Sequence, residues 1–199
     1  MIFQRFMKII KYLIQFIIIC IFYVIFKIIG VKLSSFLSGK LFEIIGPIFR
    51  SKKIINNNIK KAFPDYNSKE FDKIKSSMWN NYGRVFAEYL YMKNFRNGNL
   101  SKNISIEGED ILLNIKDQNQ KVVFISGHFS NFELMAMQID KIGIKIGAIY
   151  RPLNNIFLNP IMEKLRTNYI CKNQIPKSIP GKGRDGTRQL VRLSLIHIS

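Results

Sequence analysis

His128 is the side chain in this sequence best suited to proton transfer near neutral pH, and Glu133 follows it five positions later. Because an imidazole titrates close to neutral pH, it can take a proton from a hydroxyl group and later return it. A carboxylate beside the ring can fix its tautomer and stabilise its protonated form, as in hydrolytic triads. The pair predicts a general base with an acidic partner, so that a substrate hydroxyl attacks a thioester without a serine or cysteine nucleophile.

The spacing of this pair is a weak signal by itself, because short motifs occur by chance and a lone histidine often has a structural role. A metal site is less favoured, since one histidine and one glutamate without further clustered ligands fall short of a typical ligand set. We therefore expect no metal and no organic cofactor. Cys20 and Cys171 are expected to be packing thiols, and they define no disulfide framework.

The residues around His128 predict a strand followed by a helix. Lys121–Ser126 is apolar and rich in β-branched residues, which favours a buried strand that Gly127 ends. Ser130 or Asn131 is the expected N-cap of the next helix. His128 then lies past the carboxyl end of a strand, where α/β sheets place ligands and reactive groups.

The rest of the second half of the chain continues the alternation. Short strands are predicted at Ile104–Ile106 and Gly143–Tyr150, and helices at Asp110–Ile115 and Asn159–Tyr169. Alternating strands and helices predict an α/β fold, a sheet flanked by helices.

The first half of the chain is predicted to be helical. Residues 33–62 have an amphipathic pattern that Gly46-Pro47 should break or kink. After a turn at 63–66, Ser68 is the expected N-cap of a further helix. Its apolar stripe is expected to be core and consists of Phe71, Ile74, Met78, Tyr82 and Phe86.

Residues 1–29 are predicted to be a membrane anchor. From Tyr12 to Ile29 only Gln15 and Lys27 interrupt the apolar run, which is close to the minimum length of a spanning helix. No small-residue cleavage site follows, which favours an uncleaved anchor over a signal peptide; a buried core helix is the other interpretation. Basic residues flank both sides, so the helix either spans the membrane or lies shallowly on an anionic face.

The formal net charge of +18, from 31 Lys and Arg against 13 Asp and Glu, calls for an anionic partner. Nucleic acid, an acidic membrane face and an acidic protein all qualify. The sequence contains no zinc-finger spacing, no aromatic RNA-binding signature and no basic region leading into heptads, so we expect no nucleic acid.

Several segments, in order, resemble the bacterial lipid A biosynthesis acyltransferases, the lauroyl and myristoyl transferases of lipopolysaccharide assembly, within the lysophospholipid acyltransferase-like group. Gly127–Glu133 resembles the family's G-H-F-x-N-x-E block, and Asn57–Asp65 resembles its N-L-x-x-x-F-P stretch. The other matching segments are Tyr150-Arg151-Pro152, Asn159-Pro160 and Gly186-Thr187-Arg188. An ordered set of this kind is far more specific than any one motif.

The resemblance implies roles for individual residues. His128 would be the general base and Glu133 its partner. Arg151 and Arg166 would lie near a phosphorylated headgroup or the charge of the transition state, because guanidinium groups suit phosphate; a solvated surface charge is the alternative for each. Asn131, inside the motif, is assigned to substrate binding with them.

The resemblance also implies partners and a place. The donor would be a fatty acyl group on acyl carrier protein, an acidic partner that a basic surface attracts. The acceptor would be a hydroxyl of a lipid A precursor, at the bacterial inner membrane with the catalytic domain on the cytoplasmic side. Two other functions stay open: acyl transfer to a lysophospholipid or another glycolipid, and membrane-surface binding without catalysis.

Family members continue well beyond this length, so residues 30–192 are expected to be the N-terminal part of an acyltransferase domain with an incomplete sheet. Such a part need not be active by itself. Residues 193–199 can be encoded by CTG TCT CTT ATA CAC ATC TCN, which resembles the transposon end used to tag sequencing libraries. We expect this tail, with His197, to be a scar outside the fold, and a natural terminal strand is the alternative.

Overall fold

The computed structural model describes residues 2–176 and Arg188. These residues divide into two compact units. The larger unit holds the described residues up to Cys20 and from Met92 onwards, and the smaller unit holds Ile21–Tyr91. The boundary at Cys20 falls inside the first helix, α1 (Ile2–Ile29).

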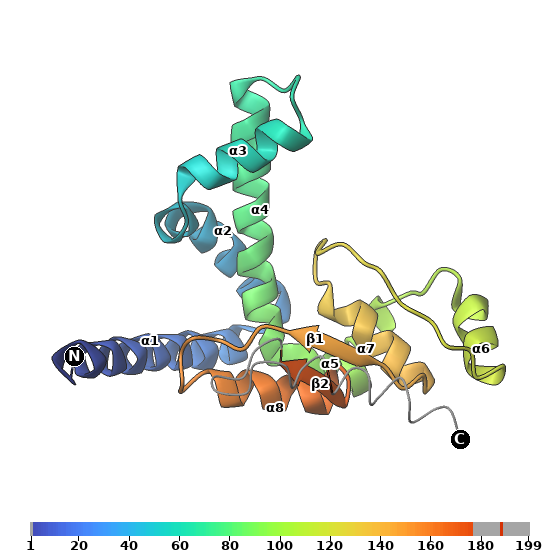
Figure 1. Cartoon of the computed structure of the whole chain (residues 1–199). Helices are drawn as coiled ribbons and strands as arrows, with labels where there is room; N and C mark the ends of the chain where they lie inside the picture. Colours follow the sequence, from blue (N-terminus) through green and yellow to red (C-terminus); the bar gives the residue numbers. More distant parts are fainter. Residues whose placement is uncertain (1, 177–187, 189–199) are drawn as a thin grey trace. The chain divides into compact units, whose positions relative to one another are not determined.

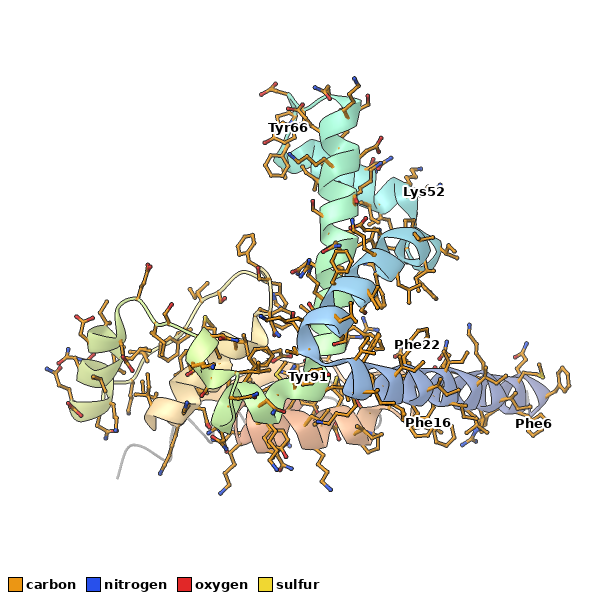
Figure 2. All side chains as sticks on the ribbon, turned by 180° about the vertical axis from the view of Figure 1, so that it is seen from behind. Phe6, Phe16, Phe22, Lys52, Tyr66 and Tyr91 are labelled. Atoms are coloured by element: carbon orange, nitrogen blue, oxygen red, sulfur yellow. The ribbon has the colours of Figure 1, made fainter. Side chains whose placement is uncertain are left out.

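Helix α1 contains the predicted apolar run and begins ten residues earlier, because the basic residues ahead of Tyr12 continue the same helix. Over Phe3–Ile29 it is long and apolar enough to cross a membrane, by length and composition. Only 6% of its most apolar stretch is buried, unlike the core helix of a soluble protein. Phe6, Phe16 and Phe22 project from it in Figure 2. The helix thus suggests an association with the membrane.

The smaller unit is helical. Helix α2 (Val31–Phe49) packs along α4 (Ser68–Glu88), and α3 (Lys52–Ala62) lies between them in sequence (Figure 1). The predicted interruption near Gly46-Pro47 occurs a few residues later, at Arg50-Ser51. A proline disturbs the hydrogen bonding of the turn before it. Helix α2 ends at Phe49, within one turn after Pro47.

The N-cap predicted for α4 is wrong by one residue. Asn67 is the cap: its side chain accepts hydrogen bonds from the backbone N–H groups of Lys69 and Glu70, at 2.9 and 3.1 Å. The Glu70 carboxylate accepts the N–H of Asn67 in return at 2.7 Å, which completes a capping box. Of the predicted apolar stripe, Tyr82 is exposed, and the side that packs inward includes Gly83, Val85 and Ala87.

The larger unit contains a β–α–β arrangement. Strand β1 (Gly147–Tyr150) pairs in parallel with β2 (Asn173–Pro176), with Gly147 opposite Asn173, and α8 (Asn159–Tyr169) connects them (Figure 1). The bounds of α8 are those predicted from the sequence. Helices α5 (Met92–Asn97), α6 (Glu109–Asp117) and α7 (Glu133–Ile142) belong to the same unit, with a short 3-10 helix at Ser101–Asn103. Another short 3-10 helix, Tyr89–Tyr91, ends the smaller unit.

Two predicted strands are wrong. Ile104–Ile106 and Lys121–Ser126 are irregular, and Val123 and Ile125 are 88% and 93% exposed rather than buried. A strand forms only where a neighbour pairs with its backbone, and the described residues place no strand beside either segment. The parallel β1–α8–β2 unit supports the α/β prediction in part, within a mostly helical structure.

Arg96 ties three helices of the larger unit together. Its guanidinium forms an ion pair with Asp140 of α7 at 2.6 Å. The same group donates hydrogen bonds to the carbonyl oxygens of Tyr169 and Ile170, at 3.3 and 3.2 Å, where α8 ends. A cation at a helix C-terminus satisfies carbonyl groups that have no partner within the helix. The buried side chains of this unit include Met92, Met137, Ile139, Ile170, Cys171 and Ile175.

Candidate active site

His128 lies in the irregular segment that leads into α7 and is exposed to solvent. Its ring packs on Phe132, with 4.2 Å between ring centroids and 48° between the planes. The structure therefore places His128 ahead of a helix, as predicted, but after an irregular segment instead of a strand. An exposed imidazole is open to a substrate.

The residues between His128 and α7 form a tight turn. Ser130 has a φ of +45°, in the left-handed region that few non-glycine residues adopt. Phe132 occupies the N-cap position without a side-chain cap, so the predicted cap at Ser130 or Asn131 is wrong. Asn131 contributes its backbone instead: its carbonyl accepts the N–H of Leu134 at 3.1 Å, which starts the first turn.

Glu133 is the first residue of α7, and its side chain is only 3% exposed. An acidic side chain is favourable there because the helix N-terminus carries partial positive charge. Its Oε1 forms an ion pair with Nη1 of Arg166, whose side chain is 11% exposed. The two residues are 33 positions apart, so this pair fixes α7 against α8.

Arg166 reaches further elements from its position on α8. Its Nε donates a hydrogen bond to Oε1 of Gln174 on β2 at 2.9 Å. Its guanidinium carbon lies 5.3 Å from the ring centre of Tyr150 on β1, within range of a cation–π interaction. Arg166 thus joins two helices and two strands through one largely buried cation.

The loop that carries Arg151 is held at both of its ends. The Tyr150 hydroxyl donates to the Glu163 carboxylate, and Asn159 donates to the same oxygen at 2.9 Å. The Asn159 side chain also accepts the N–H of Leu153 at 2.8 Å. Burial, followed by this contact with Glu163, raises the pKa of Tyr150 well above its ordinary value, so the hydroxyl remains a donor.

Arg151 itself is exposed, directly after β1. Tyr150 and Asn159 donate to the same oxygen of Glu163, so one carboxylate joins the Tyr-Arg-Pro and Asn-Pro segments and fixes the loop between them. Arg151 is left facing solvent at the carboxyl end of a parallel strand, where α/β proteins bind ligands.

Sequence reasoning missed a contact between this loop and α1. Asn155, which is buried, donates from Nδ2 to the carbonyl oxygen of Tyr12 at 2.9 Å and to Oε1 of Gln15 at 3.3 Å. The ring of Phe157 packs against Phe16, with centroids 5.9 Å apart. Gln15 was visible as a polar interruption of the apolar run, but nothing local indicated its partner 140 positions away.

Cys171 is not suited to act as a nucleophile. Cys171 is buried, and burial followed by the charge of Asp140 raises the pKa of its thiol to about 11, so it stays protonated at neutral pH. Among the residues that the structure describes, no three His, Cys, Asp or Glu side chains cluster as a metal site. Gly186 and Thr187 of the last motif, the end of the domain predicted to close near Arg192, and the tail 193–199 with His197 all lie outside the described residues.

The site as described is an exposed histidine, a buried ion-paired glutamate and an exposed arginine, placed around a β–α–β unit in a chain with a long apolar helix. These features give an α/β protein a group for proton transfer and an exposed cation. A family model described as bacterial lipid A biosynthesis acyltransferase matches residues 1–176. The chain belongs to this family, as the ordered motifs predicted, and the match includes His128, Glu133, Arg151 and Arg166. No curated protein and no solved structure matches the chain.

Family membership supports an acyltransferase of the lipid A biosynthesis type. It also supports an acyl donor and a lipid A precursor as substrates in general terms.

Proposed function

We propose that the protein transfers a fatty acyl group from an acyl carrier protein thioester to a hydroxyl of a lipid A precursor, with His128 as the general base. The observation that carries this proposal is the placement of Glu133. It follows the one histidine of the matched region by five positions, and it is buried and held by Arg166 at the start of α7. A buried carboxylate fixed by an ion pair has a defined position, and this one follows the proposed base by five residues.

In this mechanism the acceptor hydroxyl attacks the carbonyl carbon of the thioester while His128 takes the hydroxyl proton. The tetrahedral intermediate then collapses, the carbon–sulfur bond breaks, and the departing thiolate takes the proton back from His128. Glu133 acts on the imidazolium that exists between these steps, because a carboxylate stabilises a neighbouring cation. No covalent acyl-enzyme is needed, which agrees with the protonated state of the Cys171 thiol.

We assign the two arginines different roles. Arg151 is exposed beside the site, so we propose that it contacts a phosphate of the acceptor or the charge of the transition state, with Asn131 as a further substrate contact. Arg166 is committed to Glu133, Gln174 and the Tyr150 ring, so its first role is to position Glu133. Its contribution to phosphate binding remains a prediction.

Helix α1 and the net charge support the proposed place of the reaction. Helix α1 would hold the protein at the bacterial inner membrane, and the loop of Arg151 is tied to α1 through Asn155. This tie would keep the loop near the surface from which a lipid acceptor comes. The net charge of +18 favours both an acidic carrier protein and anionic lipid on the cytoplasmic side.

An acceptor competition tests this function. The purified protein in mixed micelles receives acyl carrier protein loaded with a fatty acid, together with a lipid A precursor and a lysophospholipid, and the products are identified by mass spectrometry. We expect the lipid A precursor to gain one acyl group. Acylation of the lysophospholipid alone would support that alternative acceptor, and transfer to neither would support a membrane-binding protein without catalysis.

A further inference from the structure

Helix α2 packs in the opposite way to a helix of a water-soluble protein. Its buried side chains are small, whereas most of its large apolar side chains face outward. The buried residues are Ser34, Ser35, Ser38, Gly39 and Gly46. The exposed apolar residues are Leu33, Phe36, Leu37, Ile44, Ile48 and Phe49.

The small residues allow α2 and α4 to approach closely. The Ser38 hydroxyl donates to the carbonyl oxygen of Gly83 at 2.7 Å, and a Cβ on Gly83 would lie 2.2 Å from the Ser38 carbonyl oxygen. A Cβ on Gly46 would lie 2.3 Å from the ring of Trp79. Small residues and a hydroxyl contact let the two helix backbones approach closely, so most large apolar side chains of α2 are left on its other side.

The outward side of α2 is mostly apolar. At about 100° per residue, Leu33, Leu37, Ile44 and Ile48 fall on one side of the helix. Ile44 and Ile48 are 75% and 80% exposed. A contiguous exposed apolar face marks a protein partner or a membrane. We call the side formed by these four residues the α2 outer face.

The charges around the α2 outer face favour an anionic membrane. Lys32 is exposed at the start of the helix, and the exposed cations Arg50, Lys52 and Lys53 follow its end. Basic residues at the ends of an apolar face suit anionic lipid headgroups, each contributing about 1 kcal/mol near the surface. A neutral or basic partner protein would gain nothing from cations placed at both ends.

The charged side chains within α2 indicate how deeply the helix can enter a membrane. Lys40 projects on the same side as the outer face and is paired with Glu43 at 3.1 Å. Two charged side chains near the middle of a 19-residue helix do not suit a membrane-spanning segment, which needs about 20 mostly apolar residues. A long lysine side chain can instead extend from a shallow helix to the headgroups.

We propose that α2 is a second membrane element, lying along an anionic lipid surface with its outer face in the acyl-chain region. This inference rests on the packing and charge of the smaller unit and does not depend on the acyltransferase chemistry. The α1 segment in the same unit also exposes Ile21, Val24 and Ile28.

Spin labels on the full chain test the proposal. Cysteines are introduced by Ile44→Cys and Ile48→Cys, with Lys73→Cys on the exposed side of α4 as the matched control, in a Cys20→Ser background. Buried Cys171 should not take the label, and the background chain without a new cysteine verifies this. The chain is reconstituted in vesicles of three parts phosphatidylcholine to one part phosphatidylglycerol. Collision rates are measured with oxygen, which concentrates in lipid, and with a water-soluble nickel complex.

Labels at positions 44 and 48 should have an oxygen-to-nickel ratio about threefold or more above that at position 73, because the hydrocarbon region excludes the nickel complex. Vesicles of phosphatidylcholine alone should lower that ratio. Equal ratios at all three positions would overturn the proposal. Labels shielded from both reagents would show that protein covers this face. Spin–spin broadening that disappears when unlabelled chain is added would identify a second copy of the chain as that protein. Either result would also overturn the proposal.

Discussion

Removal of the Arg166 side chain should destabilise the protein strongly, because it leaves the Glu133 carboxylate buried without its cation. The carboxylate is 3% exposed and the guanidinium 11%, so water cannot take over the role of the lost partner. Breaking such a pair from one side costs about 3–5 kcal/mol of the free energy of unfolding. The lost hydrogen bond from Arg166 to Gln174 accounts for about 1 kcal/mol of that loss.

The measurement is urea unfolding of the full chain in detergent micelles, followed by circular dichroism, for Arg166→Met and for the double variant with Glu133→Gln. The double variant should recover part of the loss, since no charge is then left buried. Lys75→Met is the matched control: it breaks the ion pair with Asp72, whose side chain is 73% exposed, and should cost less than about 1 kcal/mol. A loss for Arg166→Met no larger than this control would refute the reasoning.

Other contacts give further predictions. The Cys171 thiol should react with a maleimide far more slowly than a small free thiol in solution at pH 7.5, because its raised pKa of about 11 withholds the thiolate. It should gain reactivity only as the pH approaches about 11, and fast labelling at pH 7.5 would contradict the burial. Asn155→Ala should raise the rate of chymotrypsin cleavage at Phe157 at least about fivefold, since the lost hydrogen bonds contribute about 1–3 kcal/mol to loop closure. An unchanged cleavage rate would mean that Asn155 does not hold the loop to α1.

Local signals predicted the helices well. The bounds of α8 follow from its apolar spacing and from Pro160 in its first turn, and the apolar run of α1 is visible without any structure. The N-cap of α4 was missed by one residue because Asn67 and Ser68 are both good caps, and the capping-box partner Glu70 selects Asn67.

Strands and long-range contacts were not predictable in the same way. The run Lys121–Ser126 has the composition of a buried strand, yet strand formation depends on a partner that its own residues do not specify. Strand β2 has no apolar alternation and exists through its pairing with β1. The sequence indicated both Glu133 and Arg166 as site residues, but not that they form an ion pair across 33 positions.

The central claim is that His128 is the general base for acyl transfer. The direct test compares the protein with its His128→Ala variant, measuring the rate of acyl transfer from acyl carrier protein thioester to a lipid A precursor in mixed micelles. Because His128 is exposed and its ring packs on Phe132 at the surface, the variant should keep its fold, which circular dichroism verifies. We predict a fall of more than about a hundredfold, the lower range for loss of a general base. A folded variant with a rate close to that of the unmodified protein would contradict the account.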